Sequence, residues 1–213
     1  MKETSDDRVR ILALDVADEV SITALKDALG DEPIDILINN AGIGSGGLAS
    51  TSRIDTELWI EQTRVHAIAP ILIAQTLQSN LKCGTQRKLV SISRATRSTA
   101  NNRDGGYAYG ASKAALNSCT RGLSRYWYDD GIILGLFDPG WVATDMTAGQ
   151  SAYISTDEAA RGLMSRIAEL TLATSGSFQD FRARAYVSEL FALKSSAHLA
   201  CIPTDCTQLG AAR

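Results

Sequence analysis

A tyrosine and a lysine at helical spacing are the residues of this sequence best placed to do chemistry. The segment "GGYAYGASKAALN" (105–117) indicates a helix in which Tyr109 and Lys113 lie four residues apart. Because an α-helix turns once in about 3.6 residues, both side chains project from the same face. The pair is either an ordinary exposed pair or a phenol whose acidity is set by an ammonium. The elements around the pair distinguish between these two interpretations.

Strand-like segments recur along the chain. Each is a short apolar run rich in β-branched residues, and most end in polar or glycine residues. We expect strands over 9–16, 34–42, 88–93 and 131–137.

Helical patterns lie between these runs. Apolar residues at helical spacing predict helices over about 18–29, 56–81, 109–127 and 156–170. Asp18 is a plausible N-cap for the first helix and Gly30 a stop, and Thr156 or Asp157 would cap the last. Pro70 falls inside the second helix, so we expect a break or kink just before it.

Strands that alternate with helices predict an α/β fold with a parallel sheet covered on both faces. Ligands of such sheets bind beyond the carboxyl ends of the strands. Polar and glycine residues gather at these ends: Asp15 and Val16, Asn39 to Gly42, Ser93, and Asp138 to Gly140. We therefore expect a pocket there.

Composition excludes several classes of function. With 213 residues, 45% of them hydrophobic, the chain suits a single domain with a substantial core. A formal net charge of −3 favours neither nucleic acid nor an anionic membrane. Apolar runs are too short to span a bilayer, and the N-terminal "MKETSDDRVR" lacks the apolar core of a signal peptide. Four scattered cysteines suggest reduced thiols, and two histidines argue against a metal site. We expect a soluble cytoplasmic protein.

One glycine motif needs a separate interpretation. Residues 42–47 match G-x-G-x-x-G, the dinucleotide fingerprint, after a strand. That fingerprint also requires a helix starting at the glycines and an acid at the end of a second strand about 20 residues on. Here a polar loop runs to about Asp55, and the acid near the right distance, Glu61, lies in a helix. We interpret the segment as a flexible active-site loop.

Four ordered motifs resemble the short-chain dehydrogenase/reductase family. They are "LDV", "NNAG", a serine at a strand end ahead of "YGASK", and "PGWVATDM", and together they extend over roughly residues 8–180. YxxxK alone is common by chance, but the ordered set is far more specific. The longer "GGYAYGASKAALN" resembles the family's carbonyl-reductase-like branch.

The resemblance implies a Rossmann-like fold, NADP(H) or NAD(H) as cofactor, a small carbonyl or alcohol as substrate, and a homo-oligomer. It makes Tyr109 the acid/base, Lys113 the group that lowers its pKa and holds the nicotinamide ribose, and Ser93 the partner of the substrate oxygen. It places Asp15 and Val16 against the adenine. Asn39, Ala41 and Gly42 would line the cofactor and brace the sheet, and Pro139, Gly140, Val142 and Thr144 would border the nicotinamide.

The chemistry of carbonyl reduction suits these residue types. Hydride addition leaves an alkoxide that must be protonated. A free tyrosine has a pKa of about 10, so forming its phenolate at pH 7 costs roughly 4 kcal/mol. A cation one helical turn away lowers this cost. A serine hydroxyl orients the oxygen, and the nicotinamide supplies the hydride.

The largest departure from the family pattern precedes "LDV". The family places a βαβ unit of about 30 or more residues there, with the pyrophosphate-binding glycines and the residue that selects NAD or NADP. Only "MKETSDDRVRILA" precedes the motif here. We therefore expect an N-terminally truncated member whose sheet has an exposed edge and an uncovered apolar face. Its catalytic domain would comprise residues 1–181, with 182–213 a tail of uncertain structure.

Two site positions also depart from the pattern. His66 stands where the family commonly has a catalytic asparagine, and a helix histidine packed near the site is preferred here over a proton relay. Ser93 is preferred as the catalytic serine because it lies at the strand end, with Ser91 as the alternative. The rival functions are a catalytically silent fragment or pairing subunit, and a nucleotide-methyltransferase-like domain, which leaves Tyr109, Lys113 and "NNAG" unexplained together.

Overall fold

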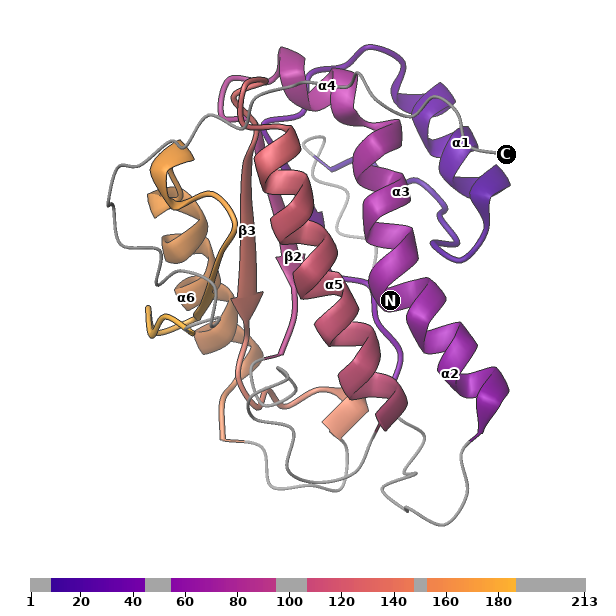
Figure 1. Ribbon diagram of the computed structural model, residues 1–213, viewed down its shortest axis with the longest axis vertical. Coiled ribbons are helices and arrows are strands. Elements are labelled where there is room, and N and C mark those ends of the chain that lie inside the picture. The colour runs from indigo at the N-terminus through magenta and orange to yellow at the C-terminus, as the bar shows by residue number, and fades with distance from the viewer. Residues whose placement is uncertain (1–8, 45–54, 95–106, 148–152, 187–213) are drawn as a thin grey trace, which may run out of the picture.

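Helices alternate with the strands of one sheet, as the sequence predicts (Figure 1). The computed structural model describes residues 9–44, 55–94, 107–147 and 153–186. The elements, in chain order, are α1 (Glu19–Leu29), β1 (Ile36–Asn39), α2 (Thr56–Thr63), the π-helical turn η1 (Arg64–Ile68), α3 (Ala69–Thr76), α4 (Gln78–Cys83), β2 (Lys88–Ile92), α5 (Tyr107–Tyr126), β3 (Ile133–Asp138), the 3₁₀ turn η3 (Asp145–Thr147), α6 (Thr156–Glu169), the 3₁₀ turn η4 (Leu172–Thr174) and β4 (Ser177–Asp180).

The sheet is parallel and its described strands follow the order β1-β2-β3-β4. Asn39 pairs with Ser91, which pairs with Leu136 on its other side, so neighbouring strands end at nearly the same level. This register brings the polar residues that follow the strands to one edge of the sheet, where the sequence predicts the pocket.

Over β2 and β3 both faces of the sheet are covered, as the alternating pattern predicts. Ile38 of the edge strand β1 is 42% exposed, which agrees with the expected exposed edge and uncovered apolar face. On one face, Leu89 and Leu134 pack with Trp127, which follows α5. On the other, Val90 and Phe137 pack against Ile167 of α6. Figure 1 shows α5 and α3 on one side of β3 and α6 on the other. Buried apolar residues of the strands point to both faces, which is typical of parallel sheets with helices on each side.

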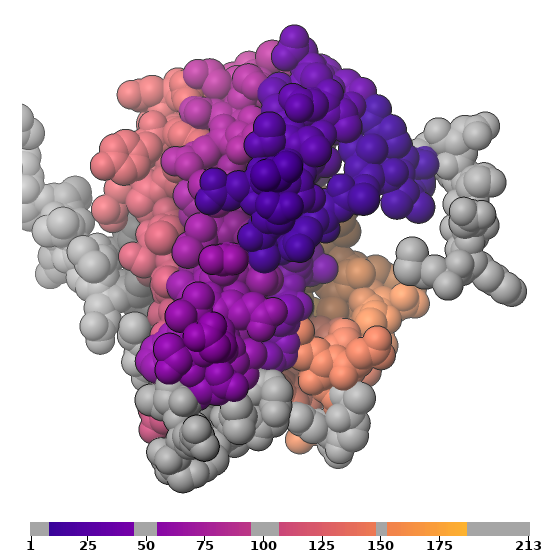
Figure 2. Space-filling view, turned by 90° about the vertical axis from the view of Figure 1, so that its right-hand side faces the viewer, coloured from indigo at the N-terminus to yellow at the C-terminus, as the bar shows by residue number. Residues whose placement is uncertain are grey.

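The expected strand over residues 9–16 is wrong. This segment pairs with no described strand, and Val9 and Ile11 are 64% and 76% exposed. In the usual Rossmann order, 3-2-1-4-5-6, the third strand is separated from the fourth by two others. Those intervening strands are not among the described residues, so the segment has no ladder partner. It lies on the surface with α1 (indigo in Figure 2), and β1 is the edge of the described sheet.

A strand that the sequence analysis does not predict closes the other side of the sheet. β4 pairs with β3, and Phe178 is buried against Leu116 of α5. Tyr186 folds back on this strand, with its N–H donating to the Phe178 carbonyl at 2.9 Å and the two rings 5.0 Å apart. The first residues of the expected tail, 182–186, therefore pack on β4; residues 187–213 lie outside the described ranges.

The long helical pattern breaks before Pro70, as predicted. Pro70 has no N–H to donate to the His66 carbonyl, which would be its α-helical partner. The chain widens there into η1, in which the Ala69 N–H bonds to Arg64 O. Single π-turns of this kind are often found at functional sites.

Helix ends follow the sequence with one exception. The Asp18 carboxylate accepts from Val20 N–H to cap α1, and Gly30 ends it with φ of 54°. For α6 the expected caps, Thr156 or Asp157, are wrong by one position: the Ser155 side chain caps it by accepting from Glu158 N–H. None of the helices in the described ranges is long and apolar enough to cross a membrane.

Candidate active site

Lys113 is buried beneath Tyr109 on α5. The lysine side chain is 6% exposed, and its Nζ donates to the Ile92 carbonyl at 3.0 Å. The same Nζ lies 5.9 Å from the centre of the Tyr109 ring. The helical spacing thus produces the predicted pair, and burial of the ammonium excludes the reading of an exposed surface pair.

Two effects lower the pKa of Lys113 to about 8. Burial is the larger, because it penalises the charged form, and the positive charge of Arg94 is the second. The Arg94 guanidinium stacks over the Trp141 ring at 4.3 Å. Arg94, to which the sequence analysis assigns no role, therefore acts on the site electrostatically. Its place directly after Ser93 at the end of β2 is the signal that could have identified it.

His66 bridges two parts of the site. Its Nε2 accepts from Ile43 N–H at 2.9 Å, and its Nδ1 lies 2.8 Å from Ser112 Oγ. The ring is 1% exposed and meets the Tyr109 ring edge-on, with centres 5.1 Å apart. These contacts agree with the interpretation of His66 as a histidine packed near the site.

Ser93 lies at the expected strand end, but its hydroxyl faces α5. It donates to Asn117 Oδ1 at 2.6 Å, and both side chains are buried. Ser91, the alternative, is 2% exposed within β2. Asn117 is a site residue that the sequence analysis missed, although it lies in the quoted "SKAALN" segment two helical turns after Tyr109.

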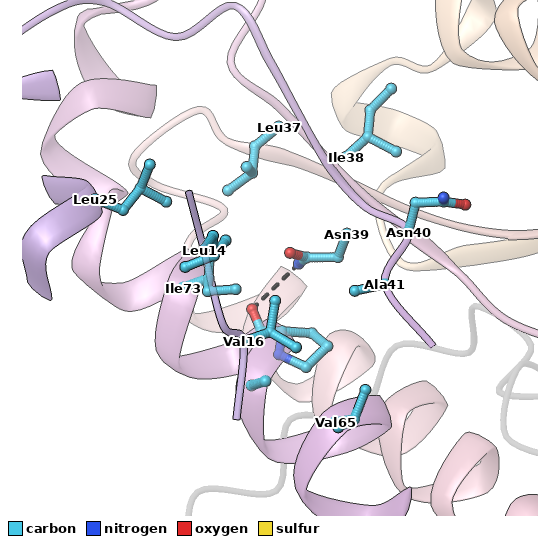
Figure 3. A pocket seen from close by; sticks show the side chains of 12 residues that line it. Leu14, Val16, Leu25, Leu37, Ile38, Asn39, Asn40, Ala41, Val65 and Ile73 are labelled. Carbon is cyan, nitrogen blue, oxygen red and sulfur yellow. Dashed lines mark hydrogen bonds between the residues drawn. The ribbon is translucent and has the colours of Figure 1, made fainter. Parts of the chain in front are cut away.

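Three residues predicted to contact the cofactor line one cavity at the edge of the sheet. Val16, Asn39 and Ala41 border a cavity of about 140 Å³ (Figure 3). The Asn39 amide donates to the Pro70 carbonyl at 3.2 Å, which ties the end of β1 to the start of α3. Asp15 lies next to Val16, and its carboxylate accepts from Ala17 N–H. The structure thus brings the expected adenine and sheet-bracing residues together.

The glycines after β1 do not form a phosphate cradle in the described residues. Ile43 N–H, within the G-x-G-x-x-G segment, donates to His66 instead, and Gly44 O accepts from Gln62 Nε2 at 2.8 Å. The next described helix, α2, begins at Thr56 with the Asp55 carboxylate as its cap. An acid at that N-terminus disfavours a bound phosphate. Residues 45–54, the expected flexible loop, lie outside the described ranges.

The loop after β3 is built around Gly140. Its φ of 79° favours glycine, and an added Cβ would lie 2.4 Å from Ile154 Cδ1. The preceding Pro139 and this glycine are half-buried, and Val142 bridges to Ile154. Further along, Thr144 N–H donates to Thr147 Oγ1. These four predicted residues, Pro139, Gly140, Val142 and Thr144, therefore belong to one braced loop.

A larger cavity adjoins this loop. It has a volume of about 450 Å³ and is bordered by Arg94, Gly140 and Trp141. Side chains from β4 and the residues after it close the far side, among them Phe181 and Tyr186. Among the described residues, histidine, cysteine and acidic side chains form no group of three that could hold a metal ion.

Comparison with known proteins agrees with this geometry. Residues 1–169 match the family model of the short chain dehydrogenases. The chain is 34% identical over 151 residues to C-signal of Myxococcus xanthus, covering 70% of this chain and 90% of that protein. It is 31% identical over 172 residues to 1-hydroxy-2-glutathionyl-2-methyl-3-butene dehydrogenase of Rhodococcus sp. (strain AD45), covering 78% and 74%.

A solved structure matches over most of the chain. NADPH-bound carbonyl reductase from chicken fatty liver superposes with a TM-score of 0.78 and 27% identity, covering 85% of this chain and 78% of that one. The parallel sheet, the Tyr109–Lys113 helix and the family match over residues 1–169 all agree. This chain belongs to the short chain dehydrogenase family of NAD(P)-linked oxidoreductases.

Proposed function

We propose that Tyr109 and Lys113 are the acid/base pair of an NAD(P)(H)-dependent reaction that interconverts a small carbonyl compound and its alcohol. One observation carries this assignment. The Lys113 ammonium is buried, fixed to Ile92 O, and lies 5.9 Å from the Tyr109 ring centre. A cation held at that position lowers the free energy of the phenolate, which the reaction forms each time it protonates an alkoxide.

The proton moves between Tyr109 and the substrate oxygen. During reduction the phenol Oη gives its proton to the oxygen of the former carbonyl, and during oxidation the phenolate takes it back. Lys113 stays charged below its pKa of about 8 and stabilises the phenolate through space. When bound, the nicotinamide of the cofactor would supply the hydride in reduction and accept it in oxidation.

The residues present fit the nicotinamide end of such a cofactor. Lys113 would hold the nicotinamide ribose. Gly140 supports this fit, because its backbone conformation and its packing against Ile154 leave no space for a side chain in the loop that would border the ring. The remaining cofactor contacts that we propose are Asp15, Val16, Asn39, Ala41, Gly42, Pro139, Val142 and Thr144.

Ser93 is proposed to orient the reacting oxygen. A hydroxyl has one proton, and here it points to Asn117 Oδ1. Its lone pairs can accept from an alcohol as they stand, whereas donation to a carbonyl requires the proton to turn from Asn117 to the substrate. The proposal therefore predicts that Asn117 tunes the strength of this contact.

Several coarser features accompany the proposed function. We propose that residues 1–181 form the catalytic domain and that two copies associate through the helices of residues 56–81 and 109–127. The exposed, unpaired Cys83 and Cys119 are compatible with the reducing cytoplasm, which is our proposed location.

A second candidate is a chain that folds but does not bind the cofactor. It is favoured because the described glycine turn that follows a strand offers no phosphate site: Ile43 N–H is bonded to His66, and the N-terminus of α2 is capped by Asp55. Titration of the purified chain with NADPH and NADH, followed by cofactor fluorescence, separates the two. The proposed function predicts saturable binding that is weakened in Lys113→Met. Absence of binding at millimolar cofactor would contradict it and support the second candidate.

A further inference from the structure

His66 is the residue through which the loop after β1 meets the catalytic helix. The ring sits in η1 and is 1% exposed. One of its nitrogens contacts Ile43 of the loop, and the other contacts Ser112 of α5. Buried imidazoles that use both nitrogens are held in one orientation, because rotation of the ring would leave polar groups without partners.

The direction of these hydrogen bonds follows from the donors. Ile43 N–H can only donate, so His66 Nε2 is the acceptor and carries no proton. In a neutral ring the proton then lies on Nδ1, which donates to Ser112 Oγ at 2.8 Å. The Ser112 hydroxyl in turn donates to the Tyr109 carbonyl at 2.9 Å. A continuous chain of donors thus runs from the loop to the backbone of the proposed acid/base.

The His66 ring also contacts the Tyr109 side chain. The two ring centres are 5.1 Å apart and the planes meet at 76°, an edge-to-face arrangement. The imidazole therefore restricts movement of the Tyr109 ring on one side, while the Ser112 hydroxyl holds the Tyr109 backbone carbonyl. Gly42 completes the packing, since a Cβ there would lie 3.4 Å from His66 Nε2.

The surroundings keep the ring neutral. Among the described residues, Lys113 and Tyr109 of α5 are the titratable groups that face it, while the neighbouring Gly42, Ile43 and Gln62 carry no charge. Burial, and after it the charge of Lys113, together lower the pKa of His66 to about 4. The tautomer with a proton on Nδ1 alone is consequently the form present at neutral pH.

We propose that His66 is a positioning residue: as the Nδ1–H tautomer it ties the loop after β1 to Ser112 and fixes the Tyr109 ring for proton transfer. This role rests on the proposed function of Tyr109. It differs from a proton relay, because both ring nitrogens are occupied by protein groups and neither faces the substrate. The positioning role requires that the geometry of the imidazole, and not its acidity, determines the rate of proton transfer from Tyr109.

The first test reads the tautomer directly. The chain has two histidines, so a ¹⁵N-labelled sample compared with His66→Phe assigns the His66 ring signals by NMR. The proposal predicts one protonated nitrogen, Nδ1, and one unprotonated nitrogen, Nε2, at neutral pH. A proton on Nε2, or a rapid average of the two tautomers, would overturn it whether or not the enzyme is active.

The second test separates the two contacts by matched variants. The amide of asparagine can replace Nδ1 as donor to Ser112, whereas the longer glutamine can replace Nε2 as acceptor for Ile43 N–H. We expect His66→Phe and His66→Gln to lower kcat by about 10- to 100-fold with KM little changed, because misplacement by about 1 Å costs a rate of that order. His66→Asn should restore most of kcat, and Ser112→Ala should abolish this rescue.

The outcomes distinguish this role from its rivals. Wild-type kcat in His66→Phe, or equal losses in His66→Asn and His66→Phe, would overturn positioning through Ser112. A general loss of folding would appear as equal losses of cofactor binding and of kcat in all three variants, and would also contradict it. If the wild-type chain binds cofactor but reduces no carbonyl, the proposed function fails, and the NMR tautomer alone decides whether His66 holds the loop to α5.

Discussion

The Lys113 ammonium donates to the Ile92 carbonyl, so the catalytic helix is fixed to the end of the central strand β2. This bond holds a buried cation 5.9 Å from the Tyr109 ring centre. A flexible lysine at the same sequence spacing would lose side-chain entropy each time it approached the phenol. The site is therefore organised before any ligand binds.

Replacement of Arg94 by Gln should raise the pKa of Lys113. The guanidinium charge is the second cause of its low value of about 8, so its removal favours the ammonium. Lys113 loses its charge as the pH rises through its pKa, and Tyr109 then loses its cation. The alkaline decline of carbonyl reduction should begin near pH 8 in the wild type and at higher pH in the variant. Arg87→Gln, at the opposite end of β2, is the control; an unchanged or lower limit in Arg94→Gln would contradict the prediction.

Folding stability should fall in mild acid because of His66. Its pKa in the folded state is about 4, below the ordinary value of 6.5, so the unfolded chain binds a proton first as the pH falls. The contribution is complete above pH 6.5 and is lost as the pH falls toward 4. The shift corresponds to about 3 kcal/mol of unfolding free energy. Urea unfolding at several pH values measures it.

The His66→Phe variant provides the control for this pH dependence, because it should flatten the curve between pH 6.5 and 4. The same slope in His66→Phe as in the wild type would assign the acid sensitivity to other groups.

Gly140→Ala should destabilise the loop after β3. Its φ of 79° costs a side-chain-bearing residue roughly 1–2 kcal/mol, and the new methyl would overlap Ile154 and Phe181. We expect a loss of at least about 2 kcal/mol in the free energy of unfolding. Gly122→Ala in α5 is the matched control, because its Cβ would meet nothing within 4 Å. Gly122→Ala should stabilise the helix by up to about 1 kcal/mol. Equal changes of the unfolding free energy in the two variants would refute the need for glycine at position 140.

Ser93→Ala should lower kcat by about 100-fold if its hydroxyl orients the reacting oxygen. Ser91→Ala is the matched variant, since Ser91 lies on the same side of β2 and is also buried. Its kcat should stay close to that of the wild type. The opposite pattern would transfer the role to Ser91, and wild-type activity in both would show that neither serine contacts the substrate oxygen.

Local patterns predicted much of the fold and part of the site. The 3.6-residue period is sufficient to place Tyr109 over Lys113, and Pro70 alone predicts the break that becomes η1. The prediction of a strand over residues 9–16 was wrong for a different reason. A strand forms only beside a partner strand, and the apolar composition of a segment does not reveal whether a partner strand is adjacent. Strand pairing is a non-local property that short windows cannot contain.

The missed site residues share one cause. Arg94, Ser112 and Asn117 act through partners that are distant in sequence: Trp141, His66 and Ser93. Each appears in the sequence as an ordinary polar residue beside a recognised motif. The contacts that give them their role depend on how α5 and the loop after β3 pack against the end of β2, which the sequence does not specify locally.

The most direct test of the central assignment compares the wild type with Tyr109→Phe. Each protein is mixed with NADPH or NADH and a small carbonyl compound, and cofactor oxidation is followed in a single turnover, beside a titration of cofactor affinity. The account predicts cofactor oxidation by the wild type, a loss of at least about 100-fold in Tyr109→Phe, and unchanged cofactor affinity. Turnover by Tyr109→Phe at the wild-type rate would contradict the assignment of Tyr109 as the acid/base.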